Sequence, residues 1–161
     1  YTNKCATPLY RQLISFVTSE SEENMNNFCT PGHEIRQILL KHSKCLAEVW
    51  DEQEVCTNDA QAAVEKLSSV ALKDQINLAC CTYRRFRTCG TVLIEKKCGA
   101  EAKDFVFKFI SFFVSNLPDV ACNNFSAEDA TCKALLPPVG TPPKGDNNSP
   151  LSQVFNIFSR H

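Results

Sequence analysis

The sequence predicts an all-α fold, a disulfide-stapled helical bundle of about five to seven helices with a Pro-rich C-terminal tail. Two observations carry this prediction: apolar residues recur at helical spacing along most of the chain, and 10 of the 161 residues are cysteines. A chain of this length suits one domain with a real core. We expect a disulfide-rich helical domain over residues 1–136, then a Pro/Gly/Asn-rich linker and a short amphipathic segment over 137–161.

The cysteines are expected to form disulfides rather than a metal site. Two ligands of one zinc ion are usually close in sequence, as in C-x2-C, and the chain has no such pair. We therefore expect no metal, no other cofactor, and the oxidising conditions outside the cell, in which disulfides persist. The disulfide cysteines are Cys5, Cys29, Cys45, Cys56, Cys80, Cys81, Cys89, Cys98, Cys122 and Cys132.

Cys80 and Cys81 are adjacent on a predicted helix, which constrains their partners. Neighbouring side chains of a helix diverge by about 100° because it has about 3.6 residues per turn. We expect the two cysteines to bridge to different elements, which makes their helix a hub with Cys89 and Cys98 as further anchors. The spacing leaves the full pairing open.

One helix is expected before a polar interruption, and a second helix is expected after it. An apolar stripe that follows Thr7-Pro8 predicts the first, and acidic and polar residues from Ser19 to Asn27 interrupt the pattern. Thr30-Pro31 predicts the start of a second helix that runs to about Trp50. The two stripes are Leu9, Leu13, Phe16 and Val17, then Ile35, Ile38, Leu39, His42, Cys45, Leu46 and Val49.

A third and a fourth helix are expected over the middle of the chain. Thr57 or Asn58 is the expected cap of the third, and the fourth runs over about residues 72–98. Gly90 and the β-branched residues after it are candidates to break or bend the fourth helix. Its stop signal is Lys96-Lys97-Cys98-Gly99, because cations favour the negative end of the helix dipole and glycine suits the following position.

A fifth, Phe-rich helix is expected over about residues 100–116. It is apolar around most of its girth, which predicts a central position. Its alternating phenylalanines would also suit a strand, but helical signals flank them. As a helix, residues 105–117 rise only about 20 Å against the ~30 Å of a bilayer, so we expect no transmembrane segment. Pro118 is expected to end this helix.

The C-terminal part is expected to hold one more core helix and a tail. Residues 126–129 start that helix, and residues 137–150 form a linker or an exposed loop because they are rich in Pro, Gly and Asn. A short apolar face then either docks on the body or stays loose. The helix contributes Ala130, Cys132, Leu135 and Leu136, and the last apolar face consists of Leu151, Val154, Phe155 and Phe158.

Other features of the sequence fit secretion. The chain begins at Tyr1 and its single methionine is Met25, so we expect a mature form without its signal peptide. Sequons predict N-glycosylation at Asn124 and Asn147, the second weakened by Pro150.

The charge pattern argues against a nucleic acid as partner. The formal net charge is -1, whereas nucleic-acid binding depends on excess positive charge. Residues 20–59 are mainly acidic and residues 84–108 mainly basic. These regions either attract each other inside the fold or form a polarised binding surface.

We expect a protein that is not an enzyme. Its imidazoles are His33, His42 and His161, and His42 falls on an apolar helix face that suits a half-buried residue better than a base. Adjacent cysteines followed by His-Asp are typical of secreted phospholipase A2, but here Arg84 and Arg85 occupy those positions. The cysteines are expected to be oxidised and therefore not nucleophilic.

The motif Tyr83-Arg84-Arg85-Phe86-Arg87 is the most prominent polar feature. Three guanidinium groups with interleaved rings suit a phosphate or carboxylate head group. The alternative, which we favour, is a basic face whose arginines reach solvent while the two rings point inward.

Bulky rings around a helix also suit a cavity for a fatty or aromatic molecule, the alternative being a filled core. The candidate ligand-binding residues are Tyr83, Phe86, Phe105, Phe109, Phe112 and Phe113.

Cys80-Cys81, Cys89, Cys98-Gly99 and Ala121-Cys122 form a recognisable cysteine arrangement. In this arrangement, residues 78–124 resemble the arthropod 27 kDa haemolymph glycoprotein family and related secreted invertebrate cysteine-rich domains. The resemblance implies a secreted helical protein of haemolymph, venom, saliva or another extracellular material. It implies no catalytic residues.

We therefore expect a secreted, non-catalytic extracellular binding protein that carries a hydrophobic small molecule or lipid. The alternative is a structural or protein-interaction component of an extracellular secretion such as haemolymph, venom, saliva or a silk-like material. The expected partner is a hydrophobic small molecule in the first case and an extracellular protein in the second.

Overall fold

The computed structural model describes residues 7, 8, 12, 21–114 and 117–145, and all regular elements within these ranges are helical. The predicted all-α, disulfide-stapled fold is confirmed. Several predicted features lie outside the described residues. They are the first apolar stripe (Leu9, Leu13, Phe16 and Val17), Cys5, Asn147 and the last apolar face at 151–158. In chain order the elements are α3 (Ser21–Cys29), α4 (Glu34–Glu52), α5 (Glu54–Glu65), the 3-10 helix η1 (Lys66–Ser68), α6 (Leu72–Val114), α7 (Leu117–Ala121) and α8 (Ala130–Leu135).

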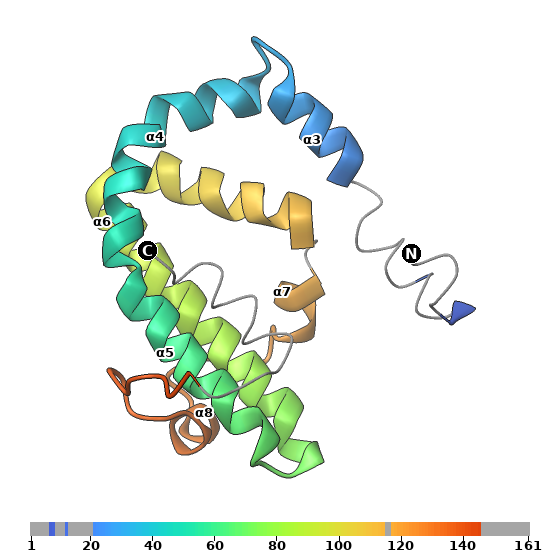
Figure 1. Ribbon diagram of the computed structural model, residues 1–161, viewed down its shortest axis with the longest axis vertical. Helices are drawn as coiled ribbons and strands as arrows, with labels where there is room; N and C mark the ends of the chain where they lie inside the picture. The colour runs from blue at the N-terminus through green and yellow to red at the C-terminus, as the bar shows by residue number, and fades with distance from the viewer. Residues whose placement is uncertain (1–6, 9–11, 13–20, 115–116, 146–161) are drawn as a thin grey trace.

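Two helix pairs meet at a corner, as Figure 1 shows. Helix α6 has two limbs, which we call the first limb (residues 72–98) and the second limb (residues 100–114). Helix α5 lies beside the first limb, whereas α4 passes the corner: its N-terminal part lies beside the second limb, and Cys45 and Val49 contact the first. Helix α3 packs against α4 and α6, while α7 and α8 pack against α6, so α6 contacts every other helix from α3 onward in the described ranges.

Helix α6 bends at one residue. On the other side, Gln53 separates α4 from α5 with helical dihedral angles (φ -70°, ψ -12°), and its side chain lies against Gly90 of the first limb. Gly99 separates the limbs of α6 with φ 85° and ψ 171°, a backbone conformation essentially restricted to glycine. The predicted stop signal at this glycine is confirmed. The Cys45–Cys98 disulfide and the Glu52–Lys97 ion pair join the two sides of the corner.

All four disulfides have one end in the first limb of α6. Cys80 is bonded to Cys122, which is next to α7, and Cys81 is bonded to Cys132 of α8. The expectation that these neighbours have different partners and make their helix a hub is confirmed. The other two pairs are Cys45–Cys98, from α4, and Cys56–Cys89, from α5.

Cys29 departs from the expected pairing. It is exposed and free at the last residue of α3. The eight other described cysteines are bonded to one another, so no described cysteine is left to pair with it, and Cys5 lies outside the described residues.

The core is built around the first limb of α6. One apolar cluster joins α5, α6 and α8, and a second lies at the corner between α4 and both limbs of α6. The predicted inner face of α4 is confirmed, because all of its stripe residues are buried or half-buried. The buried members of the clusters are Ala63, Leu78, Cys81, Cys132 and Leu136 in the first, and Val49, Ile94 and Ala102 in the second.

The Phe-rich segment is helical, as predicted, but its expected central position is wrong. Ile110 is exposed, and Val106, Phe107 and Phe109 are only half-buried. The reason is that this second limb has helices α3 and α4 as its main neighbours, whereas the first limb holds the disulfides and the larger cluster.

The polar stretch before Cys29 forms α3 rather than an interruption. Asn, Glu and Ser disfavour a helix only weakly, and tertiary contacts readily outweigh that preference. Thr30 ends this helix instead of starting the next, since its N–H and Oγ1 both donate to the Asn26 carbonyl oxygen. Gly32, with φ 84°, then makes the turn, and the His33 side chain accepts from the Ile35 N–H at the start of α4.

Two other predicted helix boundaries are wrong. Helix α5 starts at Glu54, so Thr57 lies inside it and its hydroxyl donates to the Gln53 carbonyl oxygen. Gly90 does not interrupt α6. A helical glycine costs only about 1 kcal/mol, and the adjacent Cys89 is bonded to α5.

The described part of the Phe-rich helix ends at Val114, before Pro118. Pro118 itself lies in the first turn of the separate helix α7, which tolerates its missing N–H.

The Pro-rich residues 137–145 contact α5 through its carboxylates. The Gly140 N–H donates to Asp59 Oδ1 at 2.7 Å. The N–H groups of Lys144 and Gly145 each donate to the Glu65 carboxylate at 2.8 Å. Helix α5 therefore lies between the first limb of α6 and this segment, and its side chains are buried on more than one face.

Removing the Cys81–Cys132 disulfide should lower the free energy of unfolding by about 2–4 kcal/mol, because the cross-link restricts the unfolded chain. Both cysteines are fully buried, so alanine at both positions avoids an unsatisfied polar group. Denaturant unfolding of the double variant measures the loss. The control Cys29→Ser alters an exposed, unbonded cysteine and should change stability by less than about 0.5 kcal/mol. Equal losses in the two proteins would contradict this assignment.

Glu101 joins the second limb of α6 to α4 and should make stability depend on pH. Lys41 Nζ lies 2.5 Å and His42 Nε2 3.3 Å from Glu101 Oε2. Hydrogen bonding by Lys41 holds the pKa of Glu101 below its ordinary value of 4.5. The carboxylate therefore stabilises the fold above that ordinary pKa, and this contribution is lost as the pH falls through the lowered pKa of the folded state.

Glu101→Gln should therefore unfold at a lower temperature than the wild type near neutral pH, and the gap should close as the pH falls below the ordinary pKa of 4.5 and through the lowered pKa of the folded state. Thermal unfolding across this pH range tests it, with Glu48→Gln on the exposed surface of α4 as the control for one lost negative charge. A gap that is constant with pH would show that the Glu101 carboxylate does not contribute in this way.

Candidate functional site

The basic motif of α6 places two of its arginines at a surface pocket. In a helix, positions i, i+3, i+4 and i+7 share one face. Arg84, Arg87, Thr88 and Thr91 follow this spacing and line a pocket of about 230 Å³. Val92 and the loop residues Ser126 and Ala127 complete it. The lining thus combines two cations, three hydroxyl groups and a small apolar wall.

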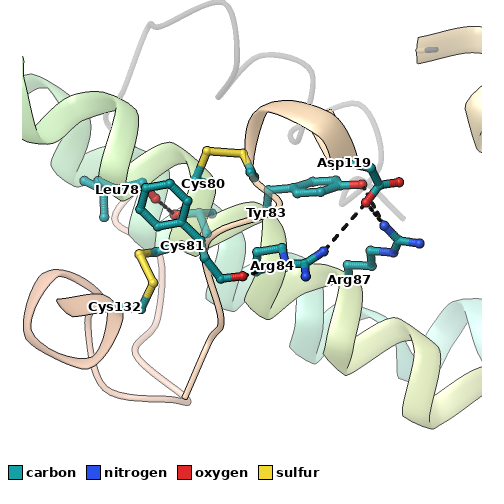
Figure 2. The surroundings of a disulfide bond; sticks show 11 residues. Leu78, Cys80, Cys81, Tyr83, Arg84, Arg87, Asp119 and Cys132 are labelled. Carbon is teal, nitrogen blue, oxygen red and sulfur yellow. Dashed lines mark hydrogen bonds and ion pairs between the residues drawn. A yellow bond between two sulfur atoms is a disulfide. The ribbon is translucent and has the colours of Figure 1, made fainter. Parts of the chain in front are cut away.

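The two pocket arginines share one counter-ion from α7, as Figure 2 shows. Arg87 forms an ion pair with Asp119, and Arg84 Nη1 lies 3.8 Å from Asp119 Oδ1. These contacts give the three side chains a formal charge of about +1 at neutral pH, since carboxylates ionise near pH 4 and guanidinium groups stay protonated.

Further contacts hold the pocket arginines in place. Arg84 Nε donates to the Phe125 carbonyl oxygen at 2.8 Å. The Arg87 guanidinium lies 4.9 Å from the centre of the Phe107 ring and 3.5 Å from the Tyr83 hydroxyl. Cation–π contact favours this position. Both guanidinium groups are therefore fixed by the surrounding protein, although each side chain remains about one-third exposed.

Arg85 does not belong to the pocket. It points toward α5, where its Nε lies 3.9 Å from Asp59 Oδ2 and its Nη1 donates to the Pro137 carbonyl oxygen at 2.7 Å. The side chains of Arg85 and Asp59 are only 15% and 9% exposed. The expectation that all three arginines reach solvent is therefore wrong, because distant residues bury Arg85.

The candidate ligand-binding residues lie in two places. Tyr83 and Phe86 are half-buried on the first limb, and the Tyr83 ring points toward Asp119 (Figure 2). Phe105 is buried and Phe109 half-buried on the second limb. The pocket at Arg84 contains none of these side chains in its lining. Phe112 and Phe113 belong to the second limb, and their side chains lie outside the described residues.

The phenylalanines of the second limb form a cluster with α3. The ring centres of Phe105 and Phe109 are 5.7 Å apart, and those of Phe28 and Phe109 are 5.4 Å apart. Such spacing is favourable for aromatic pairs. The sequence did not predict a role for Phe28, because the polar residues around it gave no helical signal for α3.

The acidic and basic regions of the sequence meet inside the fold. Asp59 pairs with Arg85 across α5 and α6, and Glu52 pairs with Lys97 at the corner. These contacts favour attraction within the fold over a polarised surface.

The described histidines have structural contacts. His33 caps α4, and His42 is half-buried beside Glu101. Within the described ranges, no group of His, Cys, Asp and Glu side chains has the arrangement of a metal site. No described helix is long and apolar enough to span a membrane.

The first sequon lies at the edge of the pocket. Asn124 is exposed in the turn that follows Cys122, two residues before Ser126 of the pocket lining. Asn147 of the second sequon lies outside the described residues.

No family model matches the chain, and no curated protein or solved structure matches it. The resemblance to the 27 kDa haemolymph glycoprotein family therefore stays a prediction.

Exchanging Arg85 should destabilise the protein far more than exchanging Arg87. Arg85→Gln leaves the mostly buried Asp59 carboxylate without its cation and should cost about 3 kcal/mol or more. Arg87→Gln removes an ion pair whose side chains are about one-third exposed, and Arg84 stays beside Asp119, so the loss should be about 1 kcal/mol or less. Denaturant unfolding of both variants gives the two values. A larger loss for Arg87→Gln would contradict the division between a structural arginine and a pocket arginine.

Proposed function

We propose that the chain is a secreted, non-catalytic binding protein that carries a hydrophobic small molecule or lipid. Its four disulfides are typical of proteins that work in an oxidising extracellular fluid. They attach four elements to one helix, which favours a rigid scaffold for binding.

The observation that carries this proposal is the partly exposed apolar surface around Phe109. Phe28 and Phe109 pack ring against ring between α3 and α6, yet both remain half-buried rather than buried. On the same two helices, Met25 is 43% and Ile110 is 44% exposed. Partly exposed aromatic and aliphatic side chains provide the contact area that an apolar ligand needs.

The chemistry of the pocket at Arg84 supports binding rather than catalysis. Its described lining offers guanidinium, hydroxyl and alkyl groups, without an imidazole or a thiol. The nearby carboxylate of Asp119 pairs with two arginines, which makes it a poor general base. Such a lining suits recognition of a charged group.

A second candidate is a structural or protein-interaction component of an extracellular secretion. Leu72 is 80% and Ile76 is 71% exposed, one turn apart at the start of α6. An exposed apolar pair of this kind favours contact with another protein.

Solvent extraction of natively secreted, purified protein followed by mass spectrometry tests the carrier proposal. We expect about one equivalent of an apolar compound per chain, and Phe109→Ala should retain less of it because the variant removes a central ring of the cluster. Leu67→Ala, which changes a half-buried side chain packed against the other apolar cluster and away from the pocket lining, is the control. An empty extract from the wild type, together with oligomers that dissociate in Ile76→Lys, would favour the interaction role instead.

A further inference from the structure

We propose that the pocket at Arg84 and Arg87 binds the carboxylate head group of an amphipathic organic acid. The proposal rests on the carrier function, since it names a chemical class of carried molecule; it places the head group of that molecule in this pocket and not at the apolar surface around Phe109. It starts from the donors that the two arginines leave unused.

Each pocket arginine has spare hydrogen-bond donors. A guanidinium group carries five N–H donors in a planar fork that matches a carboxylate. The protein contacts of Arg84 involve Nε and Nη1, and those of Arg87 involve Nη1. Among the described residues, the Nη2 groups of both arginines lack a hydrogen-bond acceptor. Asp119 does not line the pocket, so it does not fill the space beside them.

The hydroxyl groups of the lining add further donors. The Thr88 hydroxyl has no hydrogen-bond partner among the described residues and lies one helical position from Arg87. Ser126 Oγ accepts from the Glu128 N–H at 3.3 Å, which leaves its own proton available to a ligand. The Thr91 hydroxyl donates to the Arg87 carbonyl oxygen and keeps the helix side of the pocket ordered.

Charge and shape select the class of ligand. Two guanidinium groups and one carboxylate leave a single uncompensated positive charge, which a monoanion neutralises and a phosphate dianion exceeds. The two acids of the adjoining loop contact other groups: Asp129 keeps its charge and accepts from the Ser126 N–H, and Glu128 pairs with Lys133. The pocket, about 230 Å³ in volume, is smaller than most sites for whole drug-sized ligands, so it suits a head group.

The apolar part of the lining indicates where the alkyl chain of the ligand leaves the pocket. Val92 and Ala127 lie on the pocket wall, and Val92 is 60% exposed. An alkyl chain that leaves the pocket over Val92 buries apolar surface there, which a bare inorganic anion does not.

Asp119 competes with the ligand carboxylate for the two pocket arginines. Its carboxylate already pairs with both guanidinium groups, so an incoming carboxylate shares them with it. Asp119→Asn removes that competition and raises the local charge by one. The Cys80–Cys122 disulfide still holds α7 against α6 in this variant.

Titration of the full, disulfide-intact and delipidated protein with octanoate, 1-octanol and inorganic phosphate, followed by calorimetry, tests the proposal. Octanoate should bind at least about tenfold more tightly than either of the others, because charge-assisted bidentate hydrogen bonds add to burial of the chain. Phosphate that binds as tightly as octanoate would overturn the carboxylate assignment. Octanol that binds as tightly would show that the arginines do not recognise charge.

Three variants locate the binding site. Val92→Glu places a repelling carboxylate at the pocket wall and should weaken octanoate binding by about tenfold or more. Val55→Glu is the matched control, because Val55 is 61% exposed on α5, outside the pocket, and should leave binding unchanged. Asp119→Asn should tighten binding by about fivefold. Equal affinities for Val92→Glu and Val55→Glu, or weaker binding by Asp119→Asn, would overturn the assignment.

These results separate the pocket from the carrier function. A neutral lipid in the extract of the native protein, with no octanoate binding at the pocket, would contradict the pocket assignment and leave the carrier function standing. Octanoate binding that depends on Val92, with an empty extract from the native protein, would leave the anion site and remove the carrier role.

Discussion

The first limb of α6 is covalently attached to four separate parts of the chain. Its four cysteines are bonded to α4, to α5, to the residue that follows α7, and to α8, and the bonded residues are 33 to 53 positions apart in sequence. Cross-links that close long loops remove much of the freedom of the unfolded chain. The helices therefore do not depend on a large apolar core alone, which agrees with two separate clusters rather than one.

The shape of the molecule follows from where these attachments lie. Cys45–Cys98 holds α4 against the first limb immediately before Gly99, so α4 passes the corner at which α6 bends. The Cys80–Cys122 bond brings α7 and the loop after it to the face of α6 that carries Arg84 and Arg87. Asp119 and Ser126 reach the arginines in this way, so the pocket is assembled from distant segments by a disulfide.

Local patterns in the sequence predicted what depends on local physics. Helical spacing predicted the inner face of α4 and the different partners of Cys80 and Cys81, and the Lys-Lys-Cys-Gly signal predicted the stop at Gly99. It failed where distant contacts decide. Arg85 is buried by Asp59 and by the Pro137 carbonyl oxygen, which no spacing within the motif encodes. Likewise, α3 forms from polar residues because distant contacts outweigh their weak helix preference. The proximity of Arg84 to Asp119 and Ser126 could not be predicted from the sequence, because these residues come together only in the folded chain.

The most direct test of this account is disulfide mapping. Natively secreted protein is digested without reduction, and the linked peptides are identified by mass spectrometry; adjacent Cys80 and Cys81 are separated by partial reduction and stepwise alkylation. The account predicts links of Cys80 to Cys122 and Cys81 to Cys132, with Cys45 linked to Cys98 and Cys56 to Cys89. Reduced thiols at these positions, or links that bypass residues 80–98, would contradict a fold organised around one covalently anchored helix.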